Sequence, residues 1–372
     1  MSNDFIDCVI IGGGVVGLAI AKKFSKVRPV ALIEKEASLL SDTSSRNSEV
    51  IHSGIYYEND SLKRKLCMEG KKELYTYCEK KNIPHKKIGK IIIGTKAEKH
   101  KIKELYRNGL TNGLDDLKIL NKKEIRDYEP DIVADYGIFS ETSGILDTHV
   151  LGQSIANDVE KNGGLILKKT EFISANKKDN HIEIKIKNPD ESIFCFNSKL
   201  VINAGGNNSL NIDKNINHGQ NYSEYSYYGV KGNYFSYQGK NPFSHLIYPL
   251  PNKYGLGIHS TSSMDGSLKF GPDVDFDISN LSVDPNLKEK FLTSIRNWWP
   301  NIDDEKLTPD YSGIRPKVKF KNEICRDFNI LHHPNESTSL ISLFGIESPG
   351  ITSCFAIANE CERIYNRDLK NT

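Results

Sequence analysis

The sequence predicts an α/β and α+β fold, in which a parallel sheet wound with helices is joined to a second domain on a mixed or antiparallel sheet. The first observation is a strand, a glycine turn, a helix and a second strand within residues 7–34. The second is a region at 207–320 that is rich in Tyr, Ser, Gly and Pro and in short strand-like runs. The third is a return to strand, glycine turn and helix at 340–365. Buried strands alternating with helices are typical of parallel sheets.

The first segment predicts one strand–helix–strand unit. Residues 7–11 are a short apolar run, as in a strand that is buried on both faces. Glycines follow at 12–17, and residues 18–25 carry the apolar side chains of a buried helix. Residues 30–33 then predict a second buried strand, which ends at Glu34.

A lysine-rich helical stretch follows over residues 61–126. Apolar side chains recur at roughly helical spacing from Leu62 to Tyr77, and a strand at 90–94 and a surface helix at 96–109 come next. We expect the lysines of this stretch to form a solvated face, with contact to anionic lipid as the alternative.

The later part of the chain again contains both helical and strand-like stretches. Helices are expected at 148–161, about 286–298 and about 350–365, and strands within 170–196 and at 200–203, 255–259 and 340–344. The apolar and polar alternation in 182–186 indicates that the strands of 170–196 are antiparallel.

The composition excludes several classes of protein. The chain has 372 residues, of which 26% are charged and 38% hydrophobic, and at about 100–200 residues per domain this length suggests two domains or one large one. Since 50 basic residues nearly balance 48 acidic ones, no nucleic-acid partner is expected. The 28 glycines and 14 prolines have no period, which excludes a collagen-like or repeat protein.

Neither a membrane span nor a metal site is expected. No stretch approaches the roughly 20 apolar residues that cross a bilayer, and residues 1–4 lack the basic start of a secretory leader. The seven cysteines are scattered and form no C-x-x-C pair, so they predict reduced thiols in a cytoplasmic protein.

The glycine turn has the spacing and the context of a Rossmann-like dinucleotide site. Gly12 allows the tight turn, Gly14 lets the backbone approach a pyrophosphate, and Gly17 lets the helix pack closely on the strand. The helix start offers free N–H groups and the positive end of its dipole. Glu34 lies 22 residues after Gly12, as expected of an acid that binds ribose. The turn therefore predicts FAD or NAD.

FAD is favoured, because a nicotinamide dehydrogenase would continue with further regular strand–helix units. Here a helical insertion and a mixed strand domain intervene before the C-terminal strand–glycine–helix. Amides at the start of that helix, at Gly350, Ile351 and Thr352, would stabilise negative charge on the pyrimidine end of the flavin. We therefore expect a discontinuous FAD-binding domain (1–85, 141–206 and 325–372) and a substrate-binding domain (86–140 and 207–324).

Several motifs resemble the L-2-hydroxyglutarate dehydrogenase/oxidase family, a branch of the D-amino-acid oxidase-like flavoproteins that also include glycine oxidases and glycerol-3-phosphate oxidases. The resembling stretches cover nearly the whole chain, at 46–57, 61–67, 87–93, 203–205, 246–249, 257–259, 313–316 and 345–352. The resemblance implies that further FAD-binding residues lie in or beside these motifs, at Ser45, Asn47, Ser48, Ala204, Gly205 and Gly345.

The chain departs from the family pattern at three places near the expected substrate face. Many members have Asn-Ser-Gly before Val-Ile-His, and this chain has Glu49 in place of that glycine. Asn233 stands where many members have an acid. Residues 314–317 are Ile-Arg-Pro-Lys, which is closer to amino-acid oxidases. These changes leave the flavin assignment intact and bear on the substrate.

Three residues are candidates for the chemistry. Arg315 suits a carboxylate, because a planar guanidinium pairs with it through two hydrogen bonds. A histidine suits removal of the substrate proton, since its ordinary pKa is about 6.5. The family match points to His52 and His259; we favour His259 as the base, with His52 orienting substrate or flavin.

The sequence thus predicts an FAD-dependent oxidoreductase that passes a hydride from a small anionic 2-hydroxy acid, such as L-2-hydroxyglutarate, to flavin. Oxidation of an amino acid, an N-substituted amine or glycerol 3-phosphate is the second hypothesis. A flavin-binding electron-transfer subunit without substrate turnover is the third. Quinone, dioxygen and a protein all remain open as electron acceptors. The expected location is cytoplasmic, with peripheral contact to the inner face of the membrane as an option.

Overall fold

The computed structural model describes residues 4–217, 223–250, 257–334 and 337–371. One half of the molecule is built on a six-stranded sheet in the order β23-β24-β13-β1-β2-β9, whose strands come from both ends of the chain. All neighbours in this sheet are parallel except β23 and β24. The strands are β1 (Cys8–Ile11), β2 (Val30–Ile33), β9 (Leu165–Leu167), β13 (Leu200–Asn203), β23 (Asn329–Pro334) and β24 (Ser339–Phe344).

Helices cover one face of this sheet and an antiparallel sheet covers the other. Cys8 and Ile10 of β1 face the helices, whereas Val9 and Ile11 face the second sheet, as the alternation of side chains along a strand requires. The helices are α1 (Val15–Phe24), α2 (Leu62–Lys81), α5 (Thr148–Lys161) and α8 (Gly350–Asn371). The second sheet has the order β12-β11-β10-β14 and comprises β10 (Glu171–Lys177), β11 (Ile182–Lys187), β12 (Ile193–Ser198) and β14 (Ile216–Asn217), with α6 (Ser209–Lys214) beside it.

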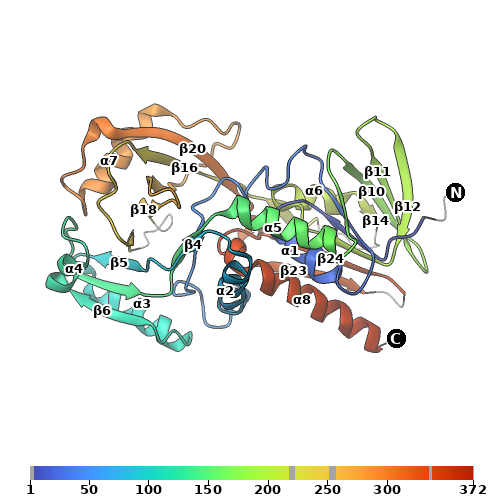
Figure 1. Cartoon of the computed structure of the whole chain (residues 1–372), viewed down its shortest axis with the longest axis horizontal. Helices are drawn as coiled ribbons and strands as arrows, with labels where there is room; N and C mark the ends of the chain where they lie inside the picture. The colour runs from blue at the N-terminus through green and yellow to red at the C-terminus, as the bar shows by residue number, and fades with distance from the viewer. Residues whose placement is uncertain (1–3, 218–222, 251–256, 335–336, 372) are drawn as a thin grey trace.

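The other half of the molecule holds two four-stranded sheets, which lie to the left in Figure 1. One has the order β17-β5-β7-β6, from β5 (Lys90–Gly94), β6 (Leu117–Asn121), β7 (Tyr136–Ser140) and β17 (Leu246–Pro249). The other has the order β18-β19-β16-β20, from β16 (Val230–Tyr237), β18 (His259–Ser262), β19 (Leu268–Gly271) and β20 (Leu307–Arg315). Their flanking helices are α3 (Lys99–Thr111), α4 (Lys122–Tyr128) and α7 (Lys288–Arg296).

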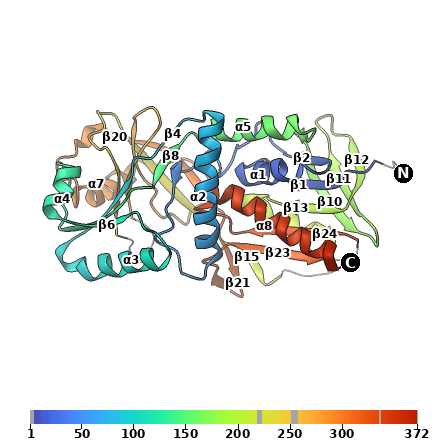
Figure 2. The same cartoon turned by 60° about the horizontal axis from the view of Figure 1, so that its bottom comes forward.

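Two small sheets lie between these parts. They are β3-β8-β4, from β3 (Val50–Ile51), β4 (His85–Lys86) and β8 (Gly144–Leu146), and β15-β21-β22, from β15 (Tyr225–Tyr227), β21 (Val318–Phe320) and β22 (Glu323–Ile324). The 3-10 turns are η1 (Lys96–Glu98), η2 (Gly206–Asn208), η3 (Pro285–Leu287) and η4 (Asp304–Lys306). Figure 2 shows α2 running between the two halves.

The predicted fold class and the antiparallel pairing of β10, β11 and β12 are confirmed. Helix boundaries differ from the predictions: α1 begins at Val15 rather than at residue 18, because Gly14 is its N-cap and Gly17 belongs to its first turn. A 3-10 turn precedes α7, and α8 continues to Asn371. The strand expected at 255–259 falls partly on residues 251–256, which are outside the described part, and β18 begins at His259.

Most lysines of residues 61–126 are exposed, as expected of a solvated face, but Lys63 and Lys90 are only 6% and 1% exposed. The expectation that Glu49 lies at the substrate face is wrong. Glu49 does not line the cavity described below; its carboxylate accepts the N–H of Thr148 at the start of α5. An acid is favourable there, because a helix start carries free N–H groups.

The division into domains stays a prediction. Within the part of the chain that the structure describes, no helix is both long and apolar enough to span a bilayer.

Candidate active site

A large cavity of about 2420 Å³ lies where the two halves meet. It is lined by most of the predicted site residues, namely Gly12, Gly14, Glu34, Asn47, Ser48, His52, Ala204, Gly205, His259, Arg315, Gly350, Ile351 and Thr352. Three predicted residues are not in its lining: Gly17, Ser45 and Gly345. The cavity is therefore walled by segments from both ends of the sequence, from Ile11 to Thr352.

The glycines of the first turn have separate structural reasons. Gly12 has a φ of +113°, and a Cβ there would lie 2.5 Å from the carbonyl oxygen of Ala204. A Cβ on Gly17 would lie 2.0 Å from the carbonyl oxygen of Gly12, so this glycine allows the close packing of α1 on β1. Gly14 is the N-cap of α1, and a Cβ there would meet only the Ser44 hydroxyl, at 3.1 Å. Its open side faces the cavity, where a ligand can approach the backbone.

Glu34 is held in place by backbone amides at the end of β2. Its Oε2 accepts the N–H of Gly13 at 2.7 Å, and its Oε1 accepts the N–H of Glu36 at 2.8 Å. A carboxylate has about four acceptor positions, so two remain for hydroxyl groups in the cavity.

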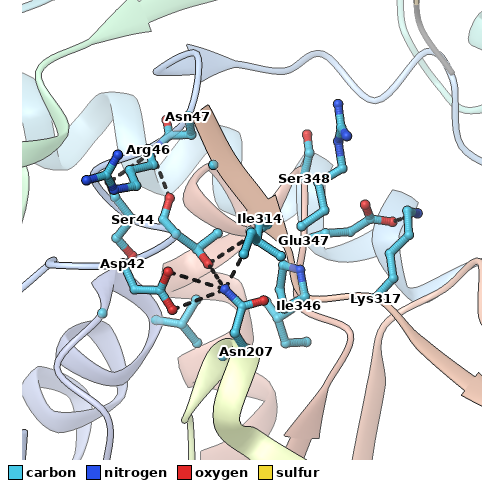
Figure 3. Close-up of a pocket in the computed structure, with 18 of the residues that line it drawn as sticks. Asp42, Ser44, Arg46, Asn47, Asn207, Ile314, Lys317, Ile346, Glu347 and Ser348 are labelled. Atoms are coloured by element: carbon cyan, nitrogen blue, oxygen red, sulfur yellow. Dashed lines mark hydrogen bonds and ion pairs between the residues drawn. The ribbon is translucent and has the colours of Figure 1, made fainter. Parts of the chain in front are cut away.

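The segment before β3 is tied to the far half of the molecule (Figure 3). The Asn207 side chain donates to the carboxylate of Asp42, at 3.1 and 3.3 Å, and to the carbonyl oxygen of Ile314 at 3.5 Å. The sequence did not predict this link. It predicted Ser45 as a cofactor-binding residue, but the neighbouring Ser44 lines the cavity, and its hydroxyl accepts the N–H of Val15. The Ser45 hydroxyl instead donates to the carbonyl oxygen of Asp42.

The C-terminal turn brings a charged cluster to the cavity. Glu347 accepts hydrogen bonds from the ammonium groups of Lys63, at 2.7 Å, and Lys317, at 2.5 Å. Burial alone would raise the pKa of Glu347, but the two ammonium groups hold it below its usual range. With Glu347 ionised, the cluster carries one net positive charge. Gly345 has a φ of +70° and shapes the turn from outside the lining.

His52 is fixed by the start of α8. Its backbone N–H donates to the hydroxyl of Thr352 at 3.1 Å, and that hydroxyl donates to the carbonyl oxygen of Val50. Its Nε2 lies 3.0 Å from the hydroxyl of Ser348 in a hydrogen bond. Burial, then Lys90 and His259, lower the pKa of His52 well below its ordinary value. This histidine is therefore neutral and already engaged.

The imidazole of His259 differs from that of His52 in its hydrogen bonds. Its Nδ1 lies 3.2 Å from the carbonyl oxygen of Gly257, and a carbonyl only accepts, so Nδ1 carries the proton. Its Nε2 is buried and has no hydrogen-bond partner among the described residues. Burial, Lys90 and Arg315 lower the pKa of His259 to about 3, although the bond to Gly257 opposes them. A neutral imidazole with a free lone pair can accept a proton.

Arg315 presents a positive charge to the cavity. Its guanidinium donates to two carbonyl oxygens, those of Lys231 at 3.3 Å and Asp273 at 2.9 Å. In the described part of the chain no carboxylate pairs with it, whereas the neighbouring Lys231 is paired with Asp275. The two carbonyls fix the fork and leave its charge to attract an anion.

These residues fit FAD. Two helix starts line the same cavity, that of α1 with its glycine turn and that of α8, and each offers backbone N–H groups to a dinucleotide with a flavin. The FAD dependent oxidoreductase family matches residues 7–362. The chain belongs to this family. It is an FAD-dependent oxidoreductase, and FAD is its cofactor.

Relatives of this FAD-dependent oxidoreductase agree with the motifs. It is 35% identical to the mitochondrial L-2-hydroxyglutarate dehydrogenase of Arabidopsis thaliana, over 100% of this chain and 85% of that protein. It is 30% identical to the protein of the same name from Dictyostelium discoideum, over 98% of this chain and 93% of that one. The dithionite-reduced L-alpha-glycerophosphate oxidase of Mycoplasma pneumoniae with FAD bound has the same fold, with a TM-score of 0.84 at 24% identity over 98% of this chain and 95% of that one. The resemblance drawn from the sequence is confirmed at the level of the family.

Proposed function

We propose that the protein oxidises L-2-hydroxyglutarate, or a closely related 2-hydroxy dicarboxylate, to the 2-oxo acid. The observation that carries this proposal is that one cavity holds both a cation free to bind a carboxylate and a nitrogen free to accept a proton. They are the guanidinium of Arg315, which has no carboxylate partner among the described residues, and Nε2 of His259, for which the same residues offer no hydrogen-bond partner. The names of the Arabidopsis and Dictyostelium relatives support the same substrate.

Each group has one task. Arg315 binds the carboxylate next to the reacting carbon and orients the substrate, and Nε2 of His259 accepts the hydroxyl proton. Bound FAD supplies the acceptor for the hydride from that carbon. An anion beside the imidazole favours its protonated form, so substrate binding raises the basicity of His259 when it is needed.

Two positively charged sites on the cavity wall favour a substrate with two carboxylates. Besides Arg315, the Lys63–Glu347–Lys317 cluster adds one positive charge to the lining. A dianion gains more from this field than L-lactate does. We therefore expect L-2-hydroxyglutarate to be preferred over monocarboxylic 2-hydroxy acids.

Glycerol 3-phosphate is the second candidate, because the Mycoplasma protein of the same fold is named for glycerophosphate and a phosphate also suits a guanidinium. The electron acceptor stays open among quinone, dioxygen and a protein. Anaerobic bleaching of the bound flavin tests the substrate, with L-2-hydroxyglutarate, its D-enantiomer, L-lactate, glycerol 3-phosphate, glycine and sarcosine compared. We expect the first to bleach the flavin fastest. Fastest bleaching by glycerol 3-phosphate or an amine would replace this proposal, and bleaching by none would favour an electron-transfer subunit.

A further inference from the structure

Lys90 is a buried cation for which the described residues supply no counter-ion. It is the first residue of β5, and its side chain is among the largest that are fully buried. In the described part of the chain, its ammonium group has no hydrogen bond and no ion pair. It lies instead over two aromatic rings, 4.0 Å from the ring centroid of Tyr248 and 5.8 Å from that of Tyr56. Burying a charge without pairing or hydrogen bonds costs free energy.

The Tyr248 ring connects Lys90 to the candidate base. The imidazole of His259 stacks on this ring, with 3.8 Å between the centroids and 18° between the planes. Two groups so close to one ring cannot share a face, so Lys90 and His259 lie on opposite faces of Tyr248. Tyr248 and His259 line the cavity and Lys90 does not. The order from the cavity inward is therefore imidazole, phenol ring, ammonium.

We propose that Lys90 is a positioning residue whose charge, one aromatic ring behind the cavity wall, sets how readily Nε2 of His259 accepts the substrate proton. This inference rests on the proposed role of His259. A positive charge opposes formation of the imidazolium on the other side of the ring. The same ammonium group also holds the Tyr248 ring in place through a cation–π contact, and the His259 imidazole stacks on that ring. Protonated Lys90 thus makes His259 a weaker base, and neutral Lys90 makes it a stronger one.

Lys90 changes charge in the working range of pH. Burial lowers the pKa of Lys90 to about 7, with only a small opposing effect of Cys67. Burial raises the pKa of that thiol to about 12, so it stays neutral. As the pH rises through about 7, Lys90 loses its proton, its repulsion of the imidazolium disappears, and proton transfer to His259 becomes easier.

Among the residues that the structure describes, few other groups can produce this effect. The titratable or charged side chains there that face Lys90 or His259 are Tyr56, Cys67, Tyr248, His52 and Arg315. Across the sheet, Lys90 pairs with Ser140 of β7 and Leu246 of β17, which do not titrate. Burial keeps the tyrosines and Cys67 neutral, both histidines have lowered pKa values, and Arg315 stays charged. Lys90 is the member of this set that changes charge near neutral pH.

The test compares the pH dependence of anaerobic flavin reduction by L-2-hydroxyglutarate in three proteins. In the parent the rate should rise through pH 7 by on the order of tenfold, the effect of one unit charge at this range in a protein interior. Lys90→Met should remove the rise and keep the fast rate at every pH. Lys90→Arg, which stays charged, should keep the slow rate. An unchanged profile in Lys90→Met would overturn the inference.

Lys22→Met is the matched control. The ammonium of Lys22 also lies over aromatic rings, 4.5 Å from the ring centroid of Tyr77 and 5.0 Å from the ring centroid of Phe355. Lys22 belongs to α1, however, and does not line the cavity. Its pH profile should equal the parental one. A profile flattened as in Lys90→Met would show that any such lysine has this effect and would contradict a specific role for Lys90.

A second measurement needs no substrate. NMR of the FAD-loaded protein, labelled at lysine and histidine side chains, should show one lysine titrating near pH 7, and the ring signals of His259 should shift with the same midpoint. Both changes should vanish in Lys90→Met, or in Lys90→Gln if the former does not fold. A Lys90 signal that titrates like exposed lysines would overturn the inference. If the NMR shifts are present but L-2-hydroxyglutarate does not reduce the flavin, the proposed substrate fails and the Lys90–His259 coupling stands.

Discussion

The two halves of this protein build their parts of the cavity in different ways. The half with the six-stranded sheet presents mainly backbone, namely a glycine turn packed against Ala204 and the starts of α1 and α8, with the carboxylates of Glu34 and Glu347 beside them. The half with β16, β18 and β20 presents side chains, above all His259 and Arg315. A backbone cradle accepts the constant part of the reaction, the dinucleotide, whereas side chains decide which substrate is oxidised. The comparison teaches that changes in the first half should cost the fold or the cofactor, and changes in the second should cost catalysis.

The sharpest contrast within the backbone half is between Gly17 and Gly14. A side chain at Gly17 would collide with the backbone of Gly12, so Gly17→Val should destabilise the fold by about 3 kcal/mol, the upper end of the usual cost of overpacking. Gly14 has an ordinary extended conformation with an open side, so Gly14→Val should fold but lose FAD. Thermal unfolding and the flavin absorption of the purified proteins check this. A yellow Gly14→Val protein would break the comparison.

On the side-chain half, the largest effect is expected at His259. His259→Phe keeps a ring on Tyr248 and removes Nε2, so anaerobic flavin reduction should slow by about 10²–10⁴-fold. FAD content should stay parental. Reduction at the parental rate would remove His259 as the base and turn attention to His52, whose Nε2 is already bonded to Ser348.

Arg315→Lys should mainly weaken substrate binding. Lysine cannot reproduce the fork that the carbonyls of Lys231 and Asp273 orient. Loss of such a charge-assisted pair is worth about 2–5 kcal/mol, so the KM for L-2-hydroxyglutarate should rise by at least tenfold while FAD stays bound. Unchanged KM in steady-state kinetics would place the carboxylate elsewhere.

The smallest effect is expected at Glu34. Glu34→Gln keeps one acceptor oxygen but loses the charge and one of the two amide bonds, to Gly13 or to Glu36. Hydrogen bonds to charged groups are worth about 1.5–3 kcal/mol, so the Kd for FAD should rise by roughly 10–100-fold without a change in substrate KM. A fluorescence titration of the apoprotein with FAD measures this. A raised KM with parental FAD affinity would contradict the division of tasks.

The same contrast explains what the sequence predicted. The glycine turn and the start of α8 follow from patterns of a few residues, and Glu34 from its place at the end of the next strand, 22 residues after Gly12, so patterns within one strand–helix–strand unit or one turn were enough. The family motifs located His52, His259 and Arg315, yet spacing along the chain could not show that they meet on one cavity. Contacts between distant segments, such as Asn207 with Asp42 or Glu347 with Lys63, had no local signal. Burial of Lys90 was missed because a lysine in a lysine-rich stretch is normally exposed.

The most direct test is the rate of anaerobic flavin reduction when the FAD-loaded protein is mixed with L-2-hydroxyglutarate carrying hydrogen or deuterium on the hydroxyl-bearing carbon. If the side-chain half holds this substrate for hydride transfer, reduction should saturate with concentration and slow several-fold with deuterium, and the D-enantiomer should react far more slowly. A protein that binds FAD but is reduced equally slowly by both enantiomers, with no effect of deuterium, would contradict the account.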